Sequence, residues 1–179
     1  MAEKRKKRET FNTPGHLHGL TFSTYRRLPF LADAVLADLV AGALFSAGKR
    51  LRFEVRAFVV MPEHCHVLVW PREDVYDMAA VLTSIKSEAA KACFTARPEL
   101  REVCRVPRRG RPDEFKFWQP GGGYDRNYWS RAEIRKFIDY LHNNPVRRGL
   151  CLYPEDYRWS SVLAYMGRDC PWPVDLSPE

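Results

Sequence analysis

Residues 60–69 read Val60-Met61-Pro62-Glu63-His64-Cys65-His66-Val67-Leu68-Val69, and this short run predicts how the centre of the chain folds. β-branched and aliphatic residues on either side of Pro62-Glu63 are typical of strands, and proline followed by a polar residue is typical of a tight turn. The run therefore predicts an antiparallel hairpin, with one strand from Arg52 to Met61 and the next from Cys65 to Pro71.

His64 and His66 stand at the start of the second strand. Side chains two residues apart on a strand point to the same face, so the two imidazoles could hold one divalent ion between them. Cys65 points to the opposite face, into apolar packing. The alternative interpretation is a pair of ordinary hydrogen-bonded histidines, because a lone His-x-His pair is a weak signal.

Apolar periodicity and turn residues predict the elements on both sides of this hairpin. They are strands at residues 16–26, 115–118 and 124–129, and helices at 31–47, from Asp74 or Asp77 to 94, from 130 to 144 and, as a short closing helix, at 157–165. Gly48 and Pro145 are expected to end the first and third helices. The order of the main elements, β-α-β-β-α-β-α, predicts an α+β fold: a ferredoxin-like split βαβ sandwich with an antiparallel sheet, helices on one face and a C-terminal helical segment.

The predicted helix at residues 130–144 combines an apolar stripe with a polar column. Ser130 is a suitable N-cap, with Glu133 placed to complete a capping box. Lys136, Tyr140 and Asn144 follow one another at four-residue spacing beside the apolar stripe. The alternative is a purely structural role, in which Tyr140 is an aromatic residue at the edge of the core and Asn144 is a helix-terminal residue before proline.

This column and the histidine pair together suit one chemistry. Two neutral imidazoles and a neutral amide oxygen would leave a bound Mg²⁺ or Mn²⁺ with its full charge, which polarises a phosphodiester. An adjacent cation also favours the phenolate form of tyrosine. Tyr140 could then attack phosphorus and form a covalent phosphotyrosine.

Composition favours a single basic domain. With 179 residues, of which 45% are hydrophobic, the chain is long enough for one core and short for two. Its formal net charge of +7 favours an anionic partner such as nucleic acid. We expect a basic, disordered arm at residues 1–12 and one domain at residues 13–179. Neither a secretory leader nor a bilayer-spanning run is evident, so a cytoplasmic protein without a membrane partner is expected.

The chain resembles the REP-associated tyrosine transposases, a branch of the HUH single-strand DNA transposases with one catalytic tyrosine. The resemblance covers most of the chain. It rests on residues 60–69 quoted above, on Trp118-Gln119-Pro120, on Phe137-Ile138-Asp139-Tyr140-Leu141-His142-Asn143-Asn144-Pro145-Val146-Arg147-Arg148-Gly149-Leu150, and on Trp159-Ser160-Ser161. Residues 13–179 are accordingly expected to form one transposase-like catalytic domain.

The resemblance implies a role for each candidate residue. His64 and His66 would be metal ligands, Tyr140 the nucleophile, and Asn144 a third ligand through its side-chain amide. The implied activity is a metal-dependent endonuclease and strand transferase that cuts single-stranded DNA beside hairpin-forming palindromes, leaving a 5′-phosphotyrosine and a free 3′-OH. Mg²⁺ or Mn²⁺ is the expected cofactor, and single-stranded or hairpin DNA the expected partner. The protein would act as a monomer or a homodimer, and whether Tyr140 meets the histidines of its own chain stays open.

Basic side chains outside this site are candidate DNA contacts, with a solvated surface as the alternative. These candidates are Lys136, Arg26, Arg27, Arg108, Arg109, Arg147 and Arg148. Lys49, Arg50 and Arg52 are expected to flank one groove together with Arg26 and Arg27, and Tyr124, Tyr128 and Trp129 could either stack on unpaired bases or fill the core. The run at residues 105–123, rich in Arg, Pro and Gly, is longer than the family pattern leads us to expect.

Two other functions compete with the enzyme. A domesticated nucleic-acid-binding protein could keep the fold and bind hairpins without turnover, although it would not need His64, His66 and Tyr140 together. A small metal-binding regulatory domain unrelated to DNA would need neither the basic charge nor the tyrosine helix.

Overall fold

The computed structural model describes residues 11–121, 123–172 and 174–176. Its strands are β1 (Leu17–Ser23), β2 (Phe53–Met61), β3 (His64–Pro71), β4 (Arg105–Val106), β5 (Glu114–Phe115) and β6 (Tyr124–Tyr128). Its helices are α1 (Ala34–Leu51), α2 (Met78–Ala96), α3 (Leu100–Cys104), α4 (Arg131–Arg147) and α5 (Val162–Tyr165), with 3₁₀ turns η1 (Tyr25–Arg27), η2 (Phe30–Ala32) and η3 (Pro154–Asp156). The main elements follow one another in the predicted order.

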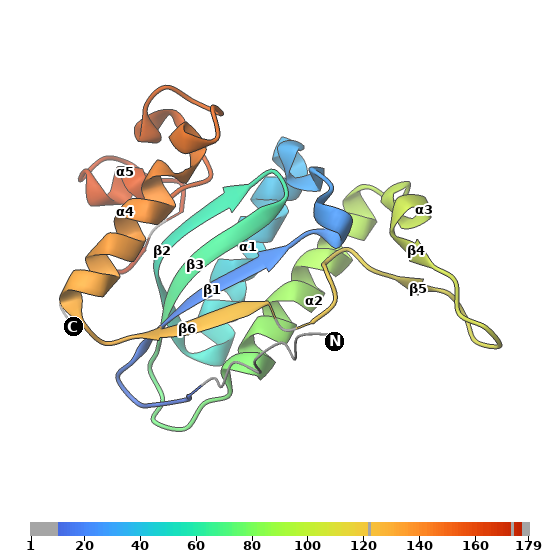
Figure 1. Ribbon diagram of the computed structural model, residues 1–179, viewed down its shortest axis with the longest axis horizontal. Helices are drawn as coiled ribbons and strands as arrows, with labels where there is room; N and C mark the ends of the chain where they lie inside the picture. The colour runs from blue at the N-terminus through green and yellow to red at the C-terminus, as the bar shows by residue number, and fades with distance from the viewer. Residues whose placement is uncertain (1–10, 122, 173, 177–179) are drawn as a thin grey trace, which may run out of the picture.

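Four strands form one antiparallel sheet in the order β2-β3-β1-β6 (Figure 1). Both β1 and β2 pair antiparallel with β3, so they run parallel to each other with β3 between them. β6 pairs antiparallel with the other side of β1. The predicted α+β class, with an antiparallel sheet and helices, is confirmed, and β1-α1-β2 with β3 inserted has the order of a split βαβ unit. The finer ferredoxin-like classification stays a prediction.

The two faces of this sheet are covered by different helices. Phe58 and Val67 belong to the core that α1 and α2 form with one face. Val59 and Leu68, at the alternate positions, belong to a second core with Leu141 of α4. The expectation that the helices share one face is therefore wrong for α4. The physical reason is that β2 and β3 carry apolar side chains on both faces, so that both faces need cover.

Helix α1 starts later and ends later than its periodicity predicts. Asp33 caps it, since its carboxylate accepts a hydrogen bond from the Val35 N–H at 2.8 Å. The prediction that Gly48 ends the helix is wrong. A Cβ at Gly48 would lie 2.9 Å from the backbone oxygen of Phe53, so this glycine allows β2 to approach the helix closely. Arg52, with a left-handed φ of 57°, ends the helix instead.

The start of α4 lacks the predicted capping box. Ser130 makes no side-chain capping hydrogen bond. Glu133 instead accepts a hydrogen bond from Arg126 of β6 at 2.7 Å, which ties the first turn of the helix to the sheet. The predicted apolar stripe is confirmed, because its four members are buried or partly buried against the sheet: Ile134, Phe137, Ile138 and Leu141.

The end of α4 also differs from the prediction, because the helix continues through Pro145 to Arg147. Proline removes only one N–H within the last turn. The Arg148 N–H closes that turn by donating to the carbonyl oxygens of Asn144 and Pro145. Asn144 is therefore helical and lies one turn after Tyr140.

The segment after η3 covers the free edge of β2. The Val60 N–H donates to the carbonyl oxygen of Trp159 at 2.9 Å, and the Ser161 N–H donates to that of Phe58 at 3.1 Å. This pairing occupies backbone groups that an edge strand otherwise exposes. The predicted closing helix at 157–165 is therefore wrong in its first part, since only Val162–Tyr165 is helical.

His142 of α4 is buried beside this segment. Its Nε2 lies 2.8 Å from the Ser161 hydroxyl, which also accepts a hydrogen bond from the Phe58 N–H at 3.0 Å. Burial lowers the pKa of His142 to about 4, against an opposing effect of Asp139. The imidazole is therefore neutral in the folded protein near pH 6, where the histidine of an unfolded chain takes up a proton.

We expect the free energy of unfolding to fall as the pH drops from 6.5 towards 4. Because the pKa of His142 is depressed in the folded state, the unfolded chain binds the proton first. Stability is therefore full above the unfolded pKa and is lost as the pH approaches the folded one. One unbalanced proton changes stability by up to about 1.4 kcal/mol per pH unit. Urea unfolding at pH 7 and pH 5 should show a shallower pH dependence for His142→Gln than for the parent, and equal dependences would refute this role.

The first described residues are tied to the domain. The Asn127 side chain donates to the Phe11 carbonyl oxygen at 2.6 Å, and the Met78 N–H donates to the Asn12 side chain at 3.3 Å. Residues 1–10 of the expected arm lie outside the described residues, so the division of the chain at residue 12 stays a prediction. No helix in the described part of the chain is long and apolar enough to cross a bilayer. All five cysteines are free.

Candidate active site

His64 and His66 lie side by side on the α4 face of the sheet, at the first residues of β3. Their Nε2 atoms are 3.0 Å apart, and their rings meet edge to face with centroids 4.7 Å apart. Each side chain is buried, with 7% of the residue exposed. Cys65 points to the other face, into the core under α1 and α2, as predicted.

Each imidazole is oriented through its Nδ1 atom. His64 Nδ1–H donates to the Glu63 carboxylate at 3.2 Å, and the Thr21 hydroxyl lies 2.7 Å from His66 Nδ1. A carboxylate can only accept, so Glu63 holds the proton of neutral His64 on Nδ1 and leaves a lone pair on Nε2. That lone pair faces His66 Nε2. Two ring nitrogens at this distance need a proton or a cation between them.

Burial keeps both rings neutral. Desolvation lowers the pKa of His64, against an opposing effect of Glu63 and with help from the charges of Arg148 and Arg27. Desolvation, with a smaller contribution from the charges of His64 and Arg27, lowers the pKa of His66 to about 3. Neutral imidazole is the form that binds metal ions, so the pair is ready to do so near neutral pH.

Tyr140 reaches this pair from α4 of the same chain. Its hydroxyl lies 3.3 Å from His66 Nε2, and 39% of the residue is exposed. The phenol oxygen is thus next to the histidines while its ring stays accessible from solvent. The site could accept a large substrate without opening of the fold.

A column of stacked rings leads to Tyr140. Tyr128 of β6 stacks on Phe137 with centroids 4.9 Å apart, and Phe137 stacks on Tyr140 with centroids 6.2 Å apart. Gly19 of β1 lies directly under the first two rings. A Cβ at Gly19 would be 2.6 Å from Tyr128 and 2.9 Å from Phe137. Glycine at this position therefore permits the stack and, through it, the approach of Tyr140 to the histidines.

The donor atoms fit a divalent metal ion. Two neutral nitrogens converge, and Glu63 and Thr21 fix the rings that carry them. Across the described residues, no group of three or more His, Cys, Asp and Glu side chains is placed to hold a metal ion, so a third protein ligand would be of another type. Asn144 is buried one turn after Tyr140, with 6% of the residue exposed. Within the described part of the chain, its side chain makes no hydrogen bond to either imidazole.

Three of the predicted DNA contacts lie around the histidine pair. Arg148, after the last turn of α4, bonds the Glu63 carboxylate at 2.9 Å and so ties the tyrosine helix to the histidine turn. The guanidinium of Arg147 lies 5.9 Å from the centroid of the Tyr140 ring. Arg27 in η1 acts on both histidines through its charge. The site is therefore bordered by positive charge.

Arg26 and Arg27 both adopt left-handed backbone conformations, with φ of 53° and 54°. Such conformations cost free energy in residues other than glycine and persist where the surroundings impose them. The Arg26 N–H donates to the side-chain oxygen of Gln119 at 3.0 Å, which helps to hold this turn. The family-like segment Trp118-Gln119-Pro120 thus supports η1 beside the site.

Lys49, Arg50 and Arg52 do not join Arg26 and Arg27 in one groove, so this expectation is wrong. They lie at the C-terminal end of α1, close to the end of the sheet where β2 begins. In contrast, η1 comes after β1, at the opposite end of the sheet, where β2 ends. Two of them pair with carboxylates there, Arg50 with Glu88 and Arg52 with Glu73.

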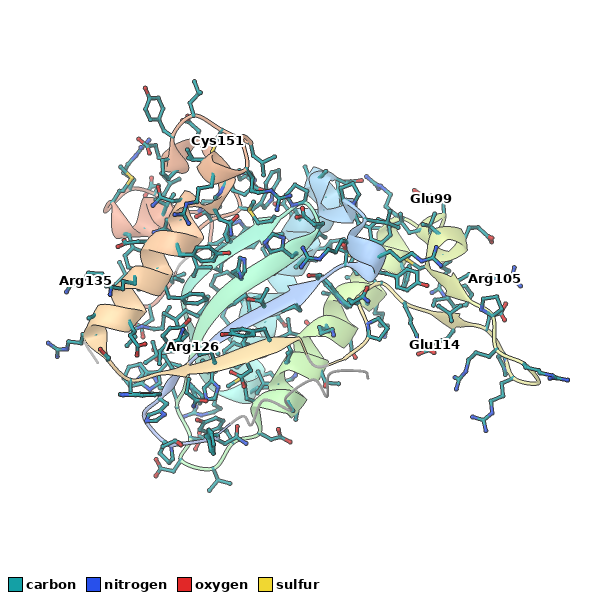
Figure 2. The ribbon with its side chains drawn as sticks, in the orientation of Figure 1. Glu99, Arg105, Glu114, Arg126, Arg135 and Cys151 are labelled. Carbon is teal, nitrogen blue, oxygen red and sulfur yellow. The ribbon has the colours of Figure 1, made fainter. Side chains whose placement is uncertain are left out.

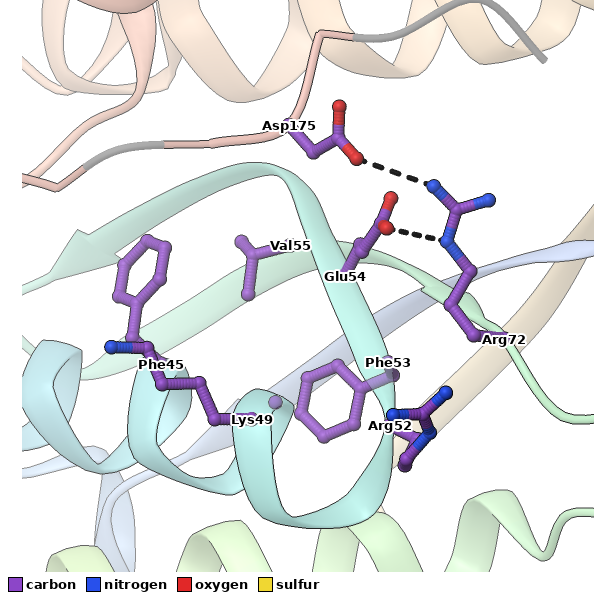
Figure 3. Close-up of a pocket in the computed structure, with 9 residues that line it drawn as sticks. Phe45, Lys49, Arg52, Phe53, Glu54, Val55, Arg72 and Asp175 are labelled. Carbon is purple, nitrogen blue, oxygen red and sulfur yellow. Dashed lines mark hydrogen bonds and ion pairs between the residues drawn. The ribbon is translucent and has the colours of Figure 1, made fainter.

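Lys49 and Arg52 line a different pocket, of about 360 Å³ (Figure 3). Its Arg72 bonds both Glu54 and Asp175, which offset much of the local positive charge. This pocket is remote from the histidines, and its mixed charge does not favour an anionic ligand.

The remaining predicted residues divide between the core and the surface. Tyr128 is buried, which favours its role in the core, whereas Trp129 is 66% exposed and stacks on His16. Arg108 and Arg109 lie in the loop between β4 and β5, away from the sheet (Figure 1).

Comparison with known proteins finds curated relatives and solved structures that are similar to this chain. The "REP-associated tyrosine transposase" of Escherichia coli K12 is 24% identical over 143 residues, which is 77% of this chain and 71% of that protein. A Haemophilus influenzae protein with the same family description is 25% identical over 114 residues, which is 61% of this chain and 58% of that protein. The resemblance to the REP-associated tyrosine transposases is confirmed. A solved REP-associated tyrosine transposase bound to a REP hairpin shares the fold, with a TM-score of 0.72 and 20% identity over 98% of this chain and 95% of that chain. No protein-family model matches the chain.

Several residues of this candidate site are not evident from the sequence. In the sequence, Glu63 is recognisable only as a turn residue. Its position next to His64 is nevertheless a signal that its carboxylate could orient the imidazole. Thr21 and Gly19 become recognisable only from the register of β1 against β3 and β6, which no local pattern contains.

Proposed function

We propose that this protein is a transposase: a metal-dependent single-stranded DNA endonuclease and strand transferase that cuts beside hairpin-forming palindromes through Tyr140. The observation that carries the proposal is the convergence of three atoms on one chain, the Tyr140 hydroxyl and the Nε2 atoms of His66 and His64. The similarity to REP-associated tyrosine transposases supports the reaction class. The relative solved with a REP hairpin supports hairpin DNA as the partner.

His64 and His66 would hold Mg²⁺ or Mn²⁺, with the Asn144 side-chain oxygen as the third protein ligand. The bound cation would supply polarisation of the scissile phosphodiester. Glu63 and Thr21 hold the two imidazoles in their present orientation, which reduces the reorganisation needed when a ligand binds.

Tyr140 supplies the nucleophile. Its oxygen attacks phosphorus, the bond from phosphorus to the 3′-oxygen breaks, and the downstream strand becomes joined to Tyr140 as a 5′-phosphotyrosine. The phenol proton is released to solvent, and the departing 3′-oxygen takes one up. Because one phosphate ester replaces another, a 3′-hydroxyl can later reverse the step and rejoin DNA. Tyr140 and the histidines belong to one chain, so a monomer would suffice for this reaction.

A pocket beside Tyr140 supports binding of the strand to be cut. It has a volume of about 210 Å³ and is lined by Arg126, Tyr128, Glu133, Lys136, Phe137 and Tyr140. Lys136 is exposed at this pocket and offers a phosphate contact, while the ring column offers a surface on which a base can stack. A strand lying here would contact Tyr140.

The test of this proposal is formation of a covalent protein–DNA adduct. Purified protein is incubated with labelled hairpin DNA from the flanks of its gene, with Mg²⁺, with Mn²⁺ or with EDTA. We expect an adduct that survives denaturation with either metal, disappears with EDTA and returns when Mn²⁺ is added in excess. An adduct indifferent to EDTA would contradict the role of the metal. Tight binding with no adduct under either metal would contradict the enzyme and favour a hairpin-binding protein.

Gly19→Ala should impair both stability and cleavage. The added methyl group forces Tyr128 and Phe137 apart, which costs about 1–3 kcal/mol and displaces Tyr140 from His66. Gly42→Ala in α1 is the matched control, because a Cβ there meets nothing within 4 Å and alanine favours the helix. Thermal unfolding and the adduct assay check both effects. If Gly19→Ala behaved like Gly42→Ala, the ring column would not position the nucleophile.

A further inference from the structure

A β-hairpin arm, defined as residues 105–115, projects from the domain (Figure 1). Its two strands, β4 and β5, pair through Arg105 and Phe115. Its base is anchored, because the Lys116 N–H donates to the carbonyl oxygen of Cys104 at 2.8 Å and the side chains of Cys104 and Phe117 are buried in the core. The arm is therefore an extension of the core rather than a free loop.

The tip of the arm concentrates positive charge. Arg108, Arg109 and Arg111 surround Gly110, whose φ of 70° makes the turn, and all three are exposed. In the described residues none of the three forms an ion pair with a carboxylate, whereas Arg105 at the base pairs with Asp113. Figure 2 shows nitrogen-bearing side chains reaching outward from this tip, beyond Arg105 and Glu114. Three guanidinium groups within four residues are therefore available to bind an anionic partner.

The arm is joined directly to the candidate active site. The Tyr25 N–H donates to the carbonyl oxygen of Phe117 at 2.8 Å, and the Arg26 N–H donates to the Gln119 side chain. The strand that leaves the arm is thereby bonded to η1, and η1 carries Arg27, whose charge acts on both histidines. Hydrogen bonds thus connect η1, which borders the histidine pair, to the segment that follows the arm.

We infer that this arm binds the phosphate backbone of a double-helical DNA stem next to the strand that Tyr140 cuts. The inference rests on the proposed function. A two-stranded β-ribbon fits the major groove of DNA, and guanidinium groups form strong paired hydrogen bonds with phosphate. The five residue steps from Arg105 to Gly110 can span at most about 17 Å, which is roughly five base-pair steps along a stem. Backbone contacts carry no sequence information, so the arm positions the DNA without selecting it.

The test compares two DNA probes of equal length and charge, a hairpin with a single-stranded extension and a scrambled strand that cannot pair. Affinity is measured over a range of salt concentrations for the parent and for R108A/R109A/R111A. We expect the triple variant to bind the hairpin roughly 10-fold or more weakly, with a salt slope shallower by about 3 because three phosphate contacts are lost. Binding of the unpaired strand, which has no double-helical stem for the arm to contact, should change less than about 2-fold.

Two control variants isolate the arm. R131A/R135A/R168A removes the same charge from exposed positions elsewhere and should leave hairpin binding near that of the parent. R108K/R109K/R111K keeps the charge and should restore most of the salt slope. Equal hairpin binding by the parent and R108A/R109A/R111A, or equal losses in both alanine variants, would overturn the role of the arm while leaving the proposed function intact. Failure of the parent to bind either probe would overturn both.

Discussion

Replacing Tyr140 by phenylalanine is expected to abolish the covalent DNA adduct and to lower strand cleavage by on the order of 10³-fold or more. The change removes only the hydroxyl, which is the proposed nucleophile. The aromatic ring that remains in Tyr140→Phe can keep the stacking on Phe137, so DNA binding and stability should stay close to those of the parent. Adduct formation is measured by the adduct assay, DNA affinity by a binding titration, and stability by thermal unfolding.

A matched control for this change is Tyr153→Phe, which removes a hydroxyl from a tyrosine that is 62% exposed and lies in the segment after α4. It should cleave like the parent. Retention of the adduct in Tyr140→Phe would assign the nucleophile to another residue. A parallel loss of binding would show that the hydroxyl serves recognition of DNA rather than chemistry.

Replacing His66 by alanine is expected to weaken Mn²⁺ binding by more than about 100-fold and to remove metal-dependent cleavage. His66 supplies one of the two converging Nε2 atoms and is also the histidine nearest the Tyr140 hydroxyl. Thr21→Val removes only the hydroxyl that orients His66 and should cost about 10- to 100-fold in metal affinity, as is usual for partners of a metal ligand. Calorimetric titration with Mn²⁺ measures the affinity without DNA.

His142→Gln serves as the control for His66→Ala, because His142 is another buried histidine but contacts Ser161 instead of the candidate site. It should bind Mn²⁺ like the parent. Undiminished Mn²⁺ affinity in His66→Ala would exclude this residue as a ligand and would leave its pairing with His64 as a hydrogen-bonded contact.

The fold was predictable where local pattern and tertiary packing agree. The turn at Pro62-Glu63, with β-branched and aliphatic residues on both sides of it, indicates the β2–β3 hairpin, and the two-residue spacing indicates the shared face of His64 and His66. The apolar stripe of α4 likewise indicates which side of that helix is buried. These signals are local, because each depends only on side-chain spacing along one element.

Prediction failed where distant segments decide the structure. Gly48 is compatible with a helix end, yet the approach of Phe53 makes it part of a longer helix. Residues 159–161 pair with β2 instead of becoming helical, because the edge of that strand needs partners. The placement of α4 on the opposite face from α1 and α2 depends on both faces of the sheet being apolar, which the order of elements does not reveal.

The candidate site was likewise predictable only in part. Its proposed reactive residues, Tyr140 and the two histidines, could be proposed from residue types and spacing. The residues that position them could not, because Thr21 and Gly19 are far from them in the sequence and meet them only through sheet register and helix packing. The arm at residues 105–115 was evident as a long basic run, but its anchored hairpin structure depends on burial of Cys104 and Phe117.

The most direct test of the central claim is to identify the amino acid that carries the DNA. The adduct formed with Mn²⁺ is digested with nuclease and protease, and the modified peptide is sequenced by mass spectrometry. We expect a nucleotide linked through its 5′-phosphate to Tyr140, together with a free 3′-hydroxyl on the released strand. A phosphate on any other residue, or a linkage through the 3′ end, would contradict the account.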